Sequence, residues 1–265
     1  MILTAATTAK GATDMGDKSS IEWTDATWNP VTGCTAISAG CDHCYAELLS
    51  HRLKKMGVDK YRNGFAVTLH PDALTQPLRW KSPRRVFVNS MSDLFHARVP
   101  RDYVVQIWDV MRDCPQHTFQ VLTKRPERMA RFTADYPAPS NVWLGTSVED
   151  ARVMQRVDRL RECRADVRFL SCEPLIGSLS ELDLTGIGWV IVGGESGAQH
   201  RSIDPEWVRE IRAQCLRAGV PFFFKQWGGR TPKVGGRELD GRTWDEMPPV
   251  EDTISQGVTL AGRGR

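Results

Sequence analysis

The sequence predicts an α/β protein whose parallel strands form a closed or nearly closed, TIM-like (β/α) barrel. One observation behind this prediction is that short apolar runs without polar alternation are separated by stretches with apolar residues at helical spacing. Such runs are typical of parallel strands that are covered on both faces. A second is their number, because eight candidate strands suit a barrel better than an open sheet. A third is length, since 265 residues can form one large barrel domain.

The predicted strands are short apolar runs bounded by polar residues or turn formers. One lies just before Cys34. The other seven are Phe65–Leu69, Val86–Asn89, Thr118–Leu122, Val142–Gly145, Val167–Leu170, Trp189–Val192 and Pro221–Phe224.

Helices are predicted between these strands, where apolar residues recur at intervals of three and four. The last one has clear end signals, with Asp204 as N-cap, Pro205 in the first turn and Gly219 as the stop. The predicted helices are Tyr45–Met56, Tyr103–Met111, Glu127–Thr133, Ala151–Cys163 and Pro205–Ala218.

The composition indicates one folded domain with two flanking segments. Residues 1–18 are polar and rich in small residues, and we expect them to be disordered. Residues 19–229 form the barrel, and residues 230–265, rich in Gly, Pro and Arg, form a loop and a tail. No signal-like segment and no apolar run of 18 residues is present, so we expect a cytoplasmic protein without a membrane anchor.

Charge alone says little about partners. The net charge is +3, from 35 basic and 32 acidic residues, which is too small to indicate nucleic-acid binding. Arg strongly outnumbers Lys among the basic residues. This bias suits phosphate and base recognition, because the guanidinium is a planar fork, but a GC-rich genome produces the same bias.

Three cysteines, Cys34, Cys41 and Cys44, lie within eleven residues and directly before a predicted helix. Three thiolates can hold three irons of a [4Fe–4S] cluster and leave the fourth iron open to a ligand. A zinc site is the first alternative, with His43 or a distant His as the fourth ligand. A disulfide with one free thiol is the second.

Polar side chains follow almost every predicted strand, and parallel strands end on the same rim of a barrel, where active sites lie. Each such residue alone is explained by a helix cap or a turn, but together they predict a site. Charges of both signs suit a zwitterionic or phosphate-bearing ligand. The candidates are Asn89, Lys124, Arg125, Glu173, Gly193, Gly194, Glu195, Ser196 and Lys225.

A three-cysteine loop after the first strand of a (β/α) barrel, followed by a helix, resembles the radical S-adenosylmethionine superfamily. More narrowly, the chain from Ser19 to Pro249 resembles an uncharacterised, phage-associated family. The stretches that carry this narrower resemblance are Glu22-Trp23-Thr24, Trp28-Asn29-Pro30-Val31-Thr32-Gly33-Cys34, Cys41-Asp42-His43-Cys44-Tyr45, Met91-Ser92-Asp93-Leu94-Phe95, Leu122-Thr123-Lys124-Arg125-Pro126, Glu173-Pro174-Leu175 and Gly193-Gly194-Glu195-Ser196.

The broader resemblance implies a [4Fe–4S] cluster on the three cysteines and S-adenosyl-L-methionine bound at its open iron. It also implies an external electron donor and radical chemistry, and we expect a nucleic-acid component as substrate, such as modified or damaged DNA. The cofactor-binding candidates are then Gly193, Gly194, Glu195, Ser196, Arg125 and Asn89, and the catalytic candidates are Lys124, Glu173 and Lys225.

The chain departs from the superfamily pattern at three points. Cys34 and Cys41 are seven residues apart, whereas the usual interval is four. His43 stands where an aromatic residue usually precedes the last cysteine. The Gly-Gly-Glu stretch that usually follows the second strand here follows the seventh, at Gly193. These departures bear on radical chemistry more than on cluster binding.

Two other functions fit the same residues. One is a DNA-binding or repair protein with a structural or redox [4Fe–4S] cluster and no cleavage of S-adenosylmethionine. The other is a zinc-supported barrel hydrolase, with Glu149, Glu173 or Asp93 binding a second metal or acting as base. The sequence leaves the substrate, the electron donor and the oligomeric state open.

Overall fold

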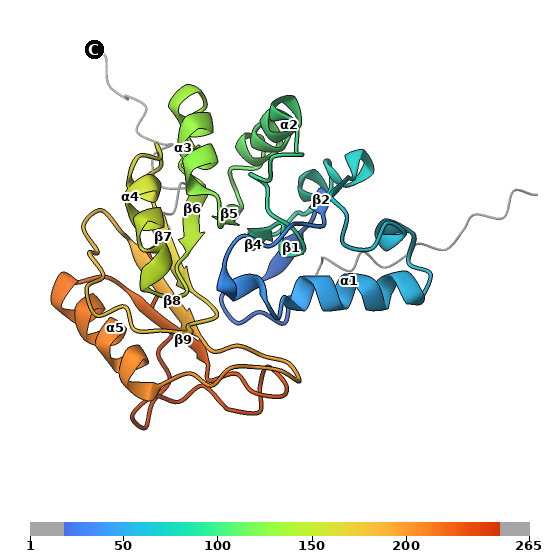
Figure 1. Cartoon of the computed structure of the whole chain (residues 1–265). Coiled ribbons are helices and arrows are strands. Elements are labelled where there is room, and N and C mark those ends of the chain that lie inside the picture. Colours follow the sequence, from blue (N-terminus) through green and yellow to red (C-terminus); the bar gives the residue numbers. More distant parts are fainter. Residues whose placement is uncertain (1–18, 250–265) are drawn as a thin grey trace, which may run out of the picture.

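The computed structural model describes residues 19–249 and shows a curled, seven-stranded parallel sheet (Figure 1). Every neighbouring pair of strands is parallel. The strands follow one another across the sheet in chain order, as β1 (Ala26–Trp28), β4 (Arg85–Val88), β5 (Thr118–Thr123), β6 (Val142–Ser147), β7 (Arg168–Cys172), β8 (Trp189–Gly193) and β9 (Phe222–Gln226). The α/β class and the parallel sheet are therefore confirmed, and the sheet forms a half-barrel.

The predicted strand Phe65–Leu69 is not part of this sheet, so the expected count of eight strands is wrong. Only Thr68–Leu69 (β3) is extended, and it pairs antiparallel with Val31–Thr32 (β2). The preceding carbonyl of Phe65 accepts a hydrogen bond from the Cys34 amide at 3.2 Å. This segment therefore supports the chain that carries the first cysteine. Within residues 19–249 the sheet has its edges at β1 and β9 and does not close.

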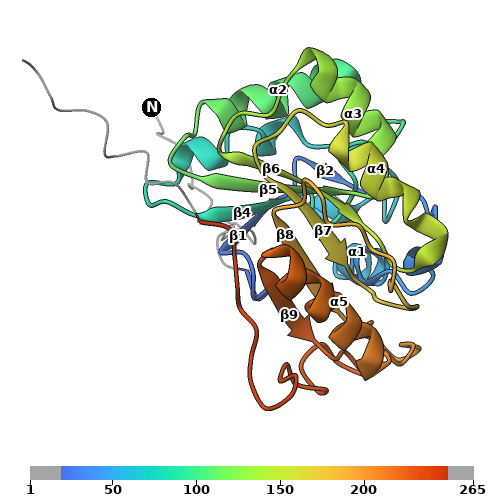
Figure 2. The same ribbon diagram turned by 90° about the vertical axis from the view of Figure 1, so that its left-hand side faces the viewer.

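The helices α2, α3, α4 and α5 cover one face of the sheet, whereas α1 stands apart from them (Figures 1 and 2). Asp204 caps α5 by accepting a hydrogen bond from the Glu206 amide, and Gly219 ends it in the left-handed conformation, as predicted. The predicted helix Ala151–Cys163 is instead a short 3₁₀ turn followed by α4. The α-helices are α1 (Tyr45–Lys55), α2 (Arg101–Arg112), α3 (Pro126–Asp135), α4 (Gln155–Arg161) and α5 (Pro205–Ala218), and the 3₁₀ turns are η1 (Ala39–Cys41), η2 (Asp59–Tyr61), η3 (Pro71–Ala73), η4 (Pro77–Arg79) and η5 (Ala151–Val153).

Because successive side chains of a strand point to opposite faces of the sheet, alternate residues form two apolar layers, one on each face. One set, which includes Val121, Leu144 and Val190, packs against the helices in the main core. The other set faces the inside of the curl and forms a second cluster, here called the aromatic floor: Trp23, Phe87, Trp143, Phe169, Trp189, Ile191 and Phe223. The floor fills the interior, so groups further along the same strands lie above it.

The predicted loop and tail begin as a segment that packs on the domain. Leu239 and Trp244 belong to the main core, and the Phe224 amide donates to the Trp244 carbonyl at 2.9 Å. Residues 1–18 and 250–265, for which we predicted disorder and a tail, lie outside the described residues. In the described part of the chain, no helix is long and apolar enough to cross a membrane.

We predict that Gly145→Ala destabilises the protein by about 1–3 kcal/mol, because overpacking a filled interior costs that much. A Cβ at Gly145 would lie 2.5 Å from ring carbons of Phe169 in the aromatic floor. The matched control is Gly188→Ala, whose Cβ would meet its nearest atom at an ordinary 3.6 Å. Urea unfolding followed by tryptophan fluorescence measures both, and equal stabilities of the two variants would contradict the packing.

Candidate functional site

The three cysteines lie on one loop, residues 33–44, here called the cysteine loop. It begins at Gly33, where φ is +83° and a Cβ would lie 2.3 Å from the Ala66 carbonyl oxygen, so only glycine fits. It ends where Cys44 takes the N-cap position of α1. All three thiols are half-buried and free of disulfide bonds.

Cys34 lies beside a buried ion pair at the end of β5. Arg125 Nη1 donates to Cys34 Sγ at 3.6 Å and to Asp93 Oδ2 at 2.8 Å, and Arg125 Nη2 donates to the Thr35 carbonyl at 2.9 Å. Asp93 also accepts from the Thr123 hydroxyl at 2.7 Å. Burial raises the pKa of the Cys34 thiol and the Asp93 charge adds to this, while Arg125 opposes both. Arg125 thus favours the thiolate, the form that binds metal.

Glu149, at the end of β6, holds the middle of the loop. Its carboxylate accepts from Lys124 Nζ at 2.8 Å, from Arg156 Nη1 at 2.8 Å and from the Ser38 hydroxyl at 2.9 Å. Burial alone would raise the pKa of Glu149, but Lys124 and Arg156 outweigh it and lower the pKa. A Cβ at Gly40 would lie 2.4 Å from the Glu149 side chain, so the loop is seated closely on this carboxylate.

Glu195, after β8, holds the last part of the loop. One oxygen accepts from His43 Nδ1 at 3.0 Å and from the Arg201 amide at 2.8 Å, and the other accepts from Arg201 Nη2. Arg201 Nη2 also donates to the Ala39 carbonyl at 2.8 Å. Burial raises the pKa of Glu195, yet the hydrogen bonds from Arg201 and His43 prevail and lower it from 4.5 to about 2. Glu195 is therefore an anion that ties two points of the loop to the sheet.

The start of α1 partly offsets the effect of burial on Cys44, whose pKa is raised overall. Burial raises the pKa of its thiol, but backbone hydrogen bonds from Glu47 and Ala46 and the charge of Lys124 oppose the rise. The amides at a helix N-terminus carry partial positive charge, which suits a thiolate. Lys124, from the end of β5, lies near the loop, because its Nζ and the Ser38 hydroxyl bind the same oxygen of Glu149.

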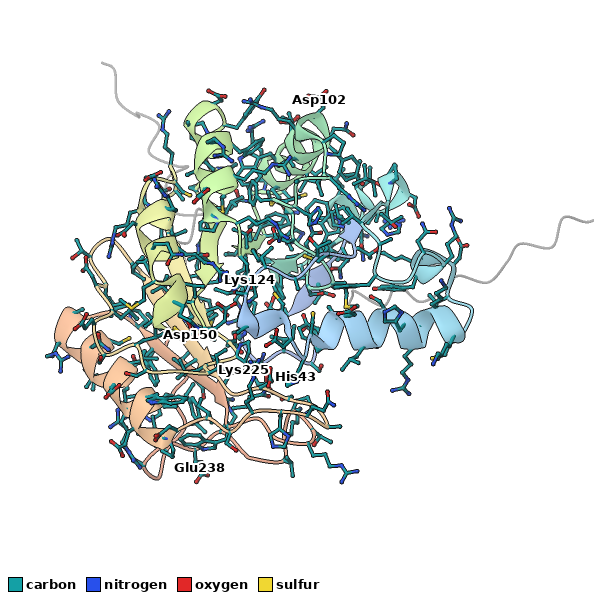
Figure 3. All side chains as sticks on the ribbon, in the orientation of Figure 1. His43, Asp102, Lys124, Asp150, Lys225 and Glu238 are labelled. Atoms are coloured by element: carbon teal, nitrogen blue, oxygen red, sulfur yellow. The ribbon has the colours of Figure 1, made fainter. Side chains whose placement is uncertain are left out.

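A further ion pair lies above the aromatic floor. Glu173 and Lys225 continue the inward-facing sets of β7 and β9, and Lys225 Nζ is 2.9 Å from Glu173 Oε1. The Ser171 hydroxyl donates to the other Glu173 oxygen at 3.1 Å. A Cβ at Gly193 would lie 2.8 Å from Glu173 Oε1, so this glycine makes room for the pair. Figure 3 shows Lys225, Lys124 and His43 at the same end of the sheet.

Asn89 combines two unusual features directly after β4. Its φ is +60°, in the left-handed region, and the residue is 2% exposed. Its side-chain oxygen accepts from the Val31 amide at 3.4 Å, but its side-chain nitrogen has no hydrogen-bond partner in the part of the chain that the structure describes. Strained backbone and unpaired buried donors concentrate at functional sites. Asn89 therefore holds an unpaired buried donor, and its role toward a cofactor stays a prediction.

The structure places all the candidates from the sequence at the carboxyl ends of the strands or just beyond them. Gly194 allows close approach to β9, since a Cβ there would lie 1.9 Å from the Trp227 carbonyl oxygen. The Ser196 hydroxyl accepts from Gln226 at 2.9 Å. Glu195 and Lys124 are engaged within the protein, so their direct roles toward a cofactor or substrate stay predictions.

Sequence reasoning missed Arg201, Arg156 and Ser38, which complete the ion pairs around the loop. They follow no strand end and stand in no motif, so the sequence offered no signal for them. Among residues 19–249, no three His, Cys, Asp or Glu side chains form a group placed to hold one metal ion. Asp93 and Glu149, which we considered as hydrolase residues, form ion pairs with Arg125 and Arg156 of the protein itself.

A family model described as "Protein of unknown function (DUF5131)" matches residues 18–248. No curated protein matches the chain. Spore photoproduct lyase in complex with dinucleoside spore photoproduct is similar in structure, with 13% identity, a TM-score of 0.49, and coverage of 76% of this chain and 64% of that one. A double mutant of that enzyme with bound AdoMet and dinucleoside spore photoproduct gives 12% identity, a TM-score of 0.44, and coverage of 73% and 62%. The chain thus spans less than two thirds of the length of either structure.

We predict that the contribution of Glu195 to stability is lost in acid. Because its pKa is about 2 in the folded protein and near 4.5 otherwise, the carboxylate favours folding fully above pH 4.5 and progressively less as the pH falls toward 2. The stability difference between the protein and its Glu195→Gln variant should therefore shrink over that window. Denaturant unfolding at a series of pH values measures it, and a difference that stays constant from pH 7 to pH 2.5 would contradict the ion pair.

Proposed function

We propose that this chain, which belongs to the DUF5131 family of proteins of unknown function, is an iron–sulfur enzyme of the radical S-adenosylmethionine type that acts on a nucleic-acid component. Cys34, Cys41 and Cys44 would hold a [4Fe–4S] cluster, with one iron open to S-adenosylmethionine. One observation carries the proposal: three unpaired thiols share one loop, which buried carboxylates anchor at the carboxyl end of a parallel sheet.

The donor set fits such a cluster. In a [4Fe–4S] cluster each cysteine binds a different iron, so the three sulfurs need not converge on one point as the ligands of a single ion do. Cys34 has a cationic donor in Arg125, and Cys44 has the backbone amides of α1. Hydrogen bonds to the sulfurs tune a cluster's reduction potential. Cys41 has the Ser38 hydroxyl at 4.0 Å.

Cys34, Cys41 and Cys44 would hold the cluster, which would supply the one-electron reductive cleavage of S-adenosylmethionine that starts hydrogen-atom abstraction from the substrate. The chain's own residues bind and orient the reactants. Asn89 would donate its unpaired amide hydrogens to the cofactor's carboxylate. The Gly193-Gly194 backbone and Ser196 would line its amino side, and Glu195 would fix the cysteine loop beside them.

The catalytic candidates would handle the substrate. Lys225 and Glu173 form an ion pair above the aromatic floor, so they would present a cation and a carboxylate side by side to the substrate. Lys124 and Arg125 bring positive charge to the same end of the sheet. Such cations suit the phosphate of a nucleotide, and this supports a nucleic-acid component as substrate.

We predict that anaerobically prepared protein contains about four irons and four sulfides per chain, as a [4Fe–4S] cluster does. Cys41→Ala should lose most of both, because Cys34 and Cys44 are themselves ligands and the other four cysteines are buried elsewhere in the fold. Cys163→Ala is the control, since Cys163 is 1% exposed and belongs to the main core. Iron and sulfide analysis decides the matter, and stoichiometric zinc with negligible iron would refute the cluster.

We predict that the dithionite-reduced protein slowly releases methionine and 5′-deoxyadenosine from S-adenosylmethionine. Asn89→Asp should weaken cofactor binding about 10- to 100-fold, because a hydrogen bond to a charged group contributes about 1.5–3 kcal/mol. An Asp side chain still accepts from the Val31 amide, but it offers no amide donor. Cluster content should not change. Chromatography of the products and equilibrium binding are the measurements.

Two comparisons make this test specific. Asn89→Gly keeps a residue that tolerates the left-handed backbone, so its effect on binding reports the loss of the side chain without added strain. A reconstituted protein that neither binds nor cleaves S-adenosylmethionine, yet binds DNA with an affinity that falls steeply with salt, would favour a DNA-binding protein with a structural or redox cluster.

A further inference from the structure

Exposed apolar side chains gather around the cysteine loop and α1. Of the eight large hydrophobic residues that are exposed among residues 19–249, five belong to this region, and they are between 39% and 65% exposed. They are Ile37, Tyr45, Leu48, Leu49 and Met56. The other three are scattered over the chain. A gathered patch of this kind marks an interaction site more often than single exposed residues do.

Four of these residues lie on one side of α1. The helix buries only Ala46, Ser50 and Leu53, which are one turn apart. Successive residues of an α-helix are turned by about 100°, so five residues on the exposed side of α1 fall within an arc of about 100° around the helix axis. Together they extend over about 16 Å along the axis. We call this side the α1 stripe: Tyr45, Leu48, Leu49, Arg52 and Met56. Figure 1 shows α1 apart from the row of helices that covers the sheet, and Figure 3 shows side chains of α1 that project away from the rest of the molecule.

The helix that carries the stripe is basic, although only Arg52 of its basic residues belongs to the stripe itself. α1 carries Arg52, Lys54 and Lys55 but only one acidic residue, Glu47, which lies 3.8 Å from His51. In the described part of the chain, no ion pair joins these three basic residues to a carboxylate. Apolar area with unpaired positive charge suits a partner with an acidic, partly apolar surface, because the charges speed and orient the encounter.

The stripe also starts at the cysteine loop. Tyr45 directly follows Cys44, so the N-terminal end of the stripe adjoins a ligand position of the proposed cluster. An electron has to reach that cluster from outside the chain. We propose that the α1 stripe docks an acidic one-electron carrier protein with a reduced flavin or iron–sulfur centre. This inference rests on the proposed function.

The proposed step moves a single electron from the carrier to the cluster. One electron leaves the carrier's reduced centre, which is oxidised, and enters the cluster, which is reduced; no covalent bond forms or breaks. Redox partners associate through small, short-lived interfaces, and a stripe one helix face wide is of that kind. The positive side chains serve the rate of encounter, and Leu48 and Met56 supply area that excludes water.

The test measures electron transfer from a reduced, acidic plant-type [2Fe–2S] ferredoxin to the reconstituted protein, by stopped-flow absorbance at low and high salt. The double variant Leu48→Glu/Arg52→Glu should slow this transfer at least 10-fold at low salt. Reduction by dithionite, which needs no docking surface, should keep its rate. The matched control is Leu216→Glu/Arg217→Glu, which makes the same two changes at exposed positions of α5 and should leave both rates unchanged.

The outcomes separate this inference from the function on which it rests. Wild-type protein without a cluster defeats the proposed function at the first step. A cluster that the ferredoxin reduces equally fast in both double variants overturns the docking site and leaves the proposed function standing. A wild-type dimer that Leu48→Glu/Arg52→Glu converts to a monomer, seen by light scattering, also overturns it, since the stripe would then bind a second copy. Equal circular dichroism and iron content of the variants show that folding is intact.

Discussion

The rest of the site depends on one constraint, the satisfaction of three buried carboxylates that follow alternate strands of the sheet, β4, β6 and β8. Asp93, Glu149 and Glu195 are each at most 7% exposed at the side chain, and a buried anion is tolerated only when cations and hydrogen-bond donors surround it. In every case part of that shell comes from the cysteine loop or from a cation that also holds it. The charges of the sheet and the position of the loop are therefore coupled.

This coupling explains how a loop with little regular structure keeps a fixed position. Only a single 3₁₀ turn, η1, interrupts it between Gly33 and α1. Arg125, Lys124 and Arg201 each bond a strand-end carboxylate, and two of them also bond loop carbonyls. Below the loop, the aromatic floor fills the inside of the curl. The three thiols therefore lie beyond a packed interior, at the carboxyl ends of the strands.

The sequence predicted those parts of the fold that local patterns determine. Six strands and the capped ends of α5 follow from apolar runs and from Asp204 and Gly219. Phe65–Leu69 was assigned to the barrel wrongly, because an apolar run indicates extended chain but not its partner. That partner is Val31–Thr32, the segment just before Cys34, which lies 36 to 38 residues upstream of the residues it pairs with. The roles of Glu149 and Glu195 were equally hidden, since their cations Arg156 and Arg201 follow no pattern that marks them.

A small apolar cluster finally connects the two ends of the cysteine loop with α1. Ala46 and Leu53 of α1 pack with Tyr61 and Met91, and Cys44 and Phe65 lie against the same cluster. The carbonyls of Met91 and Phe65 accept the amides of Gly33 and Cys34, so this cluster also holds the start of the loop. Because one side of α1 is fixed in this way, its opposite side is left to solvent. The same contacts that set the position of Cys44 therefore leave the α1 stripe exposed beside it, so that a partner on the stripe would lie next to the last of the three thiols.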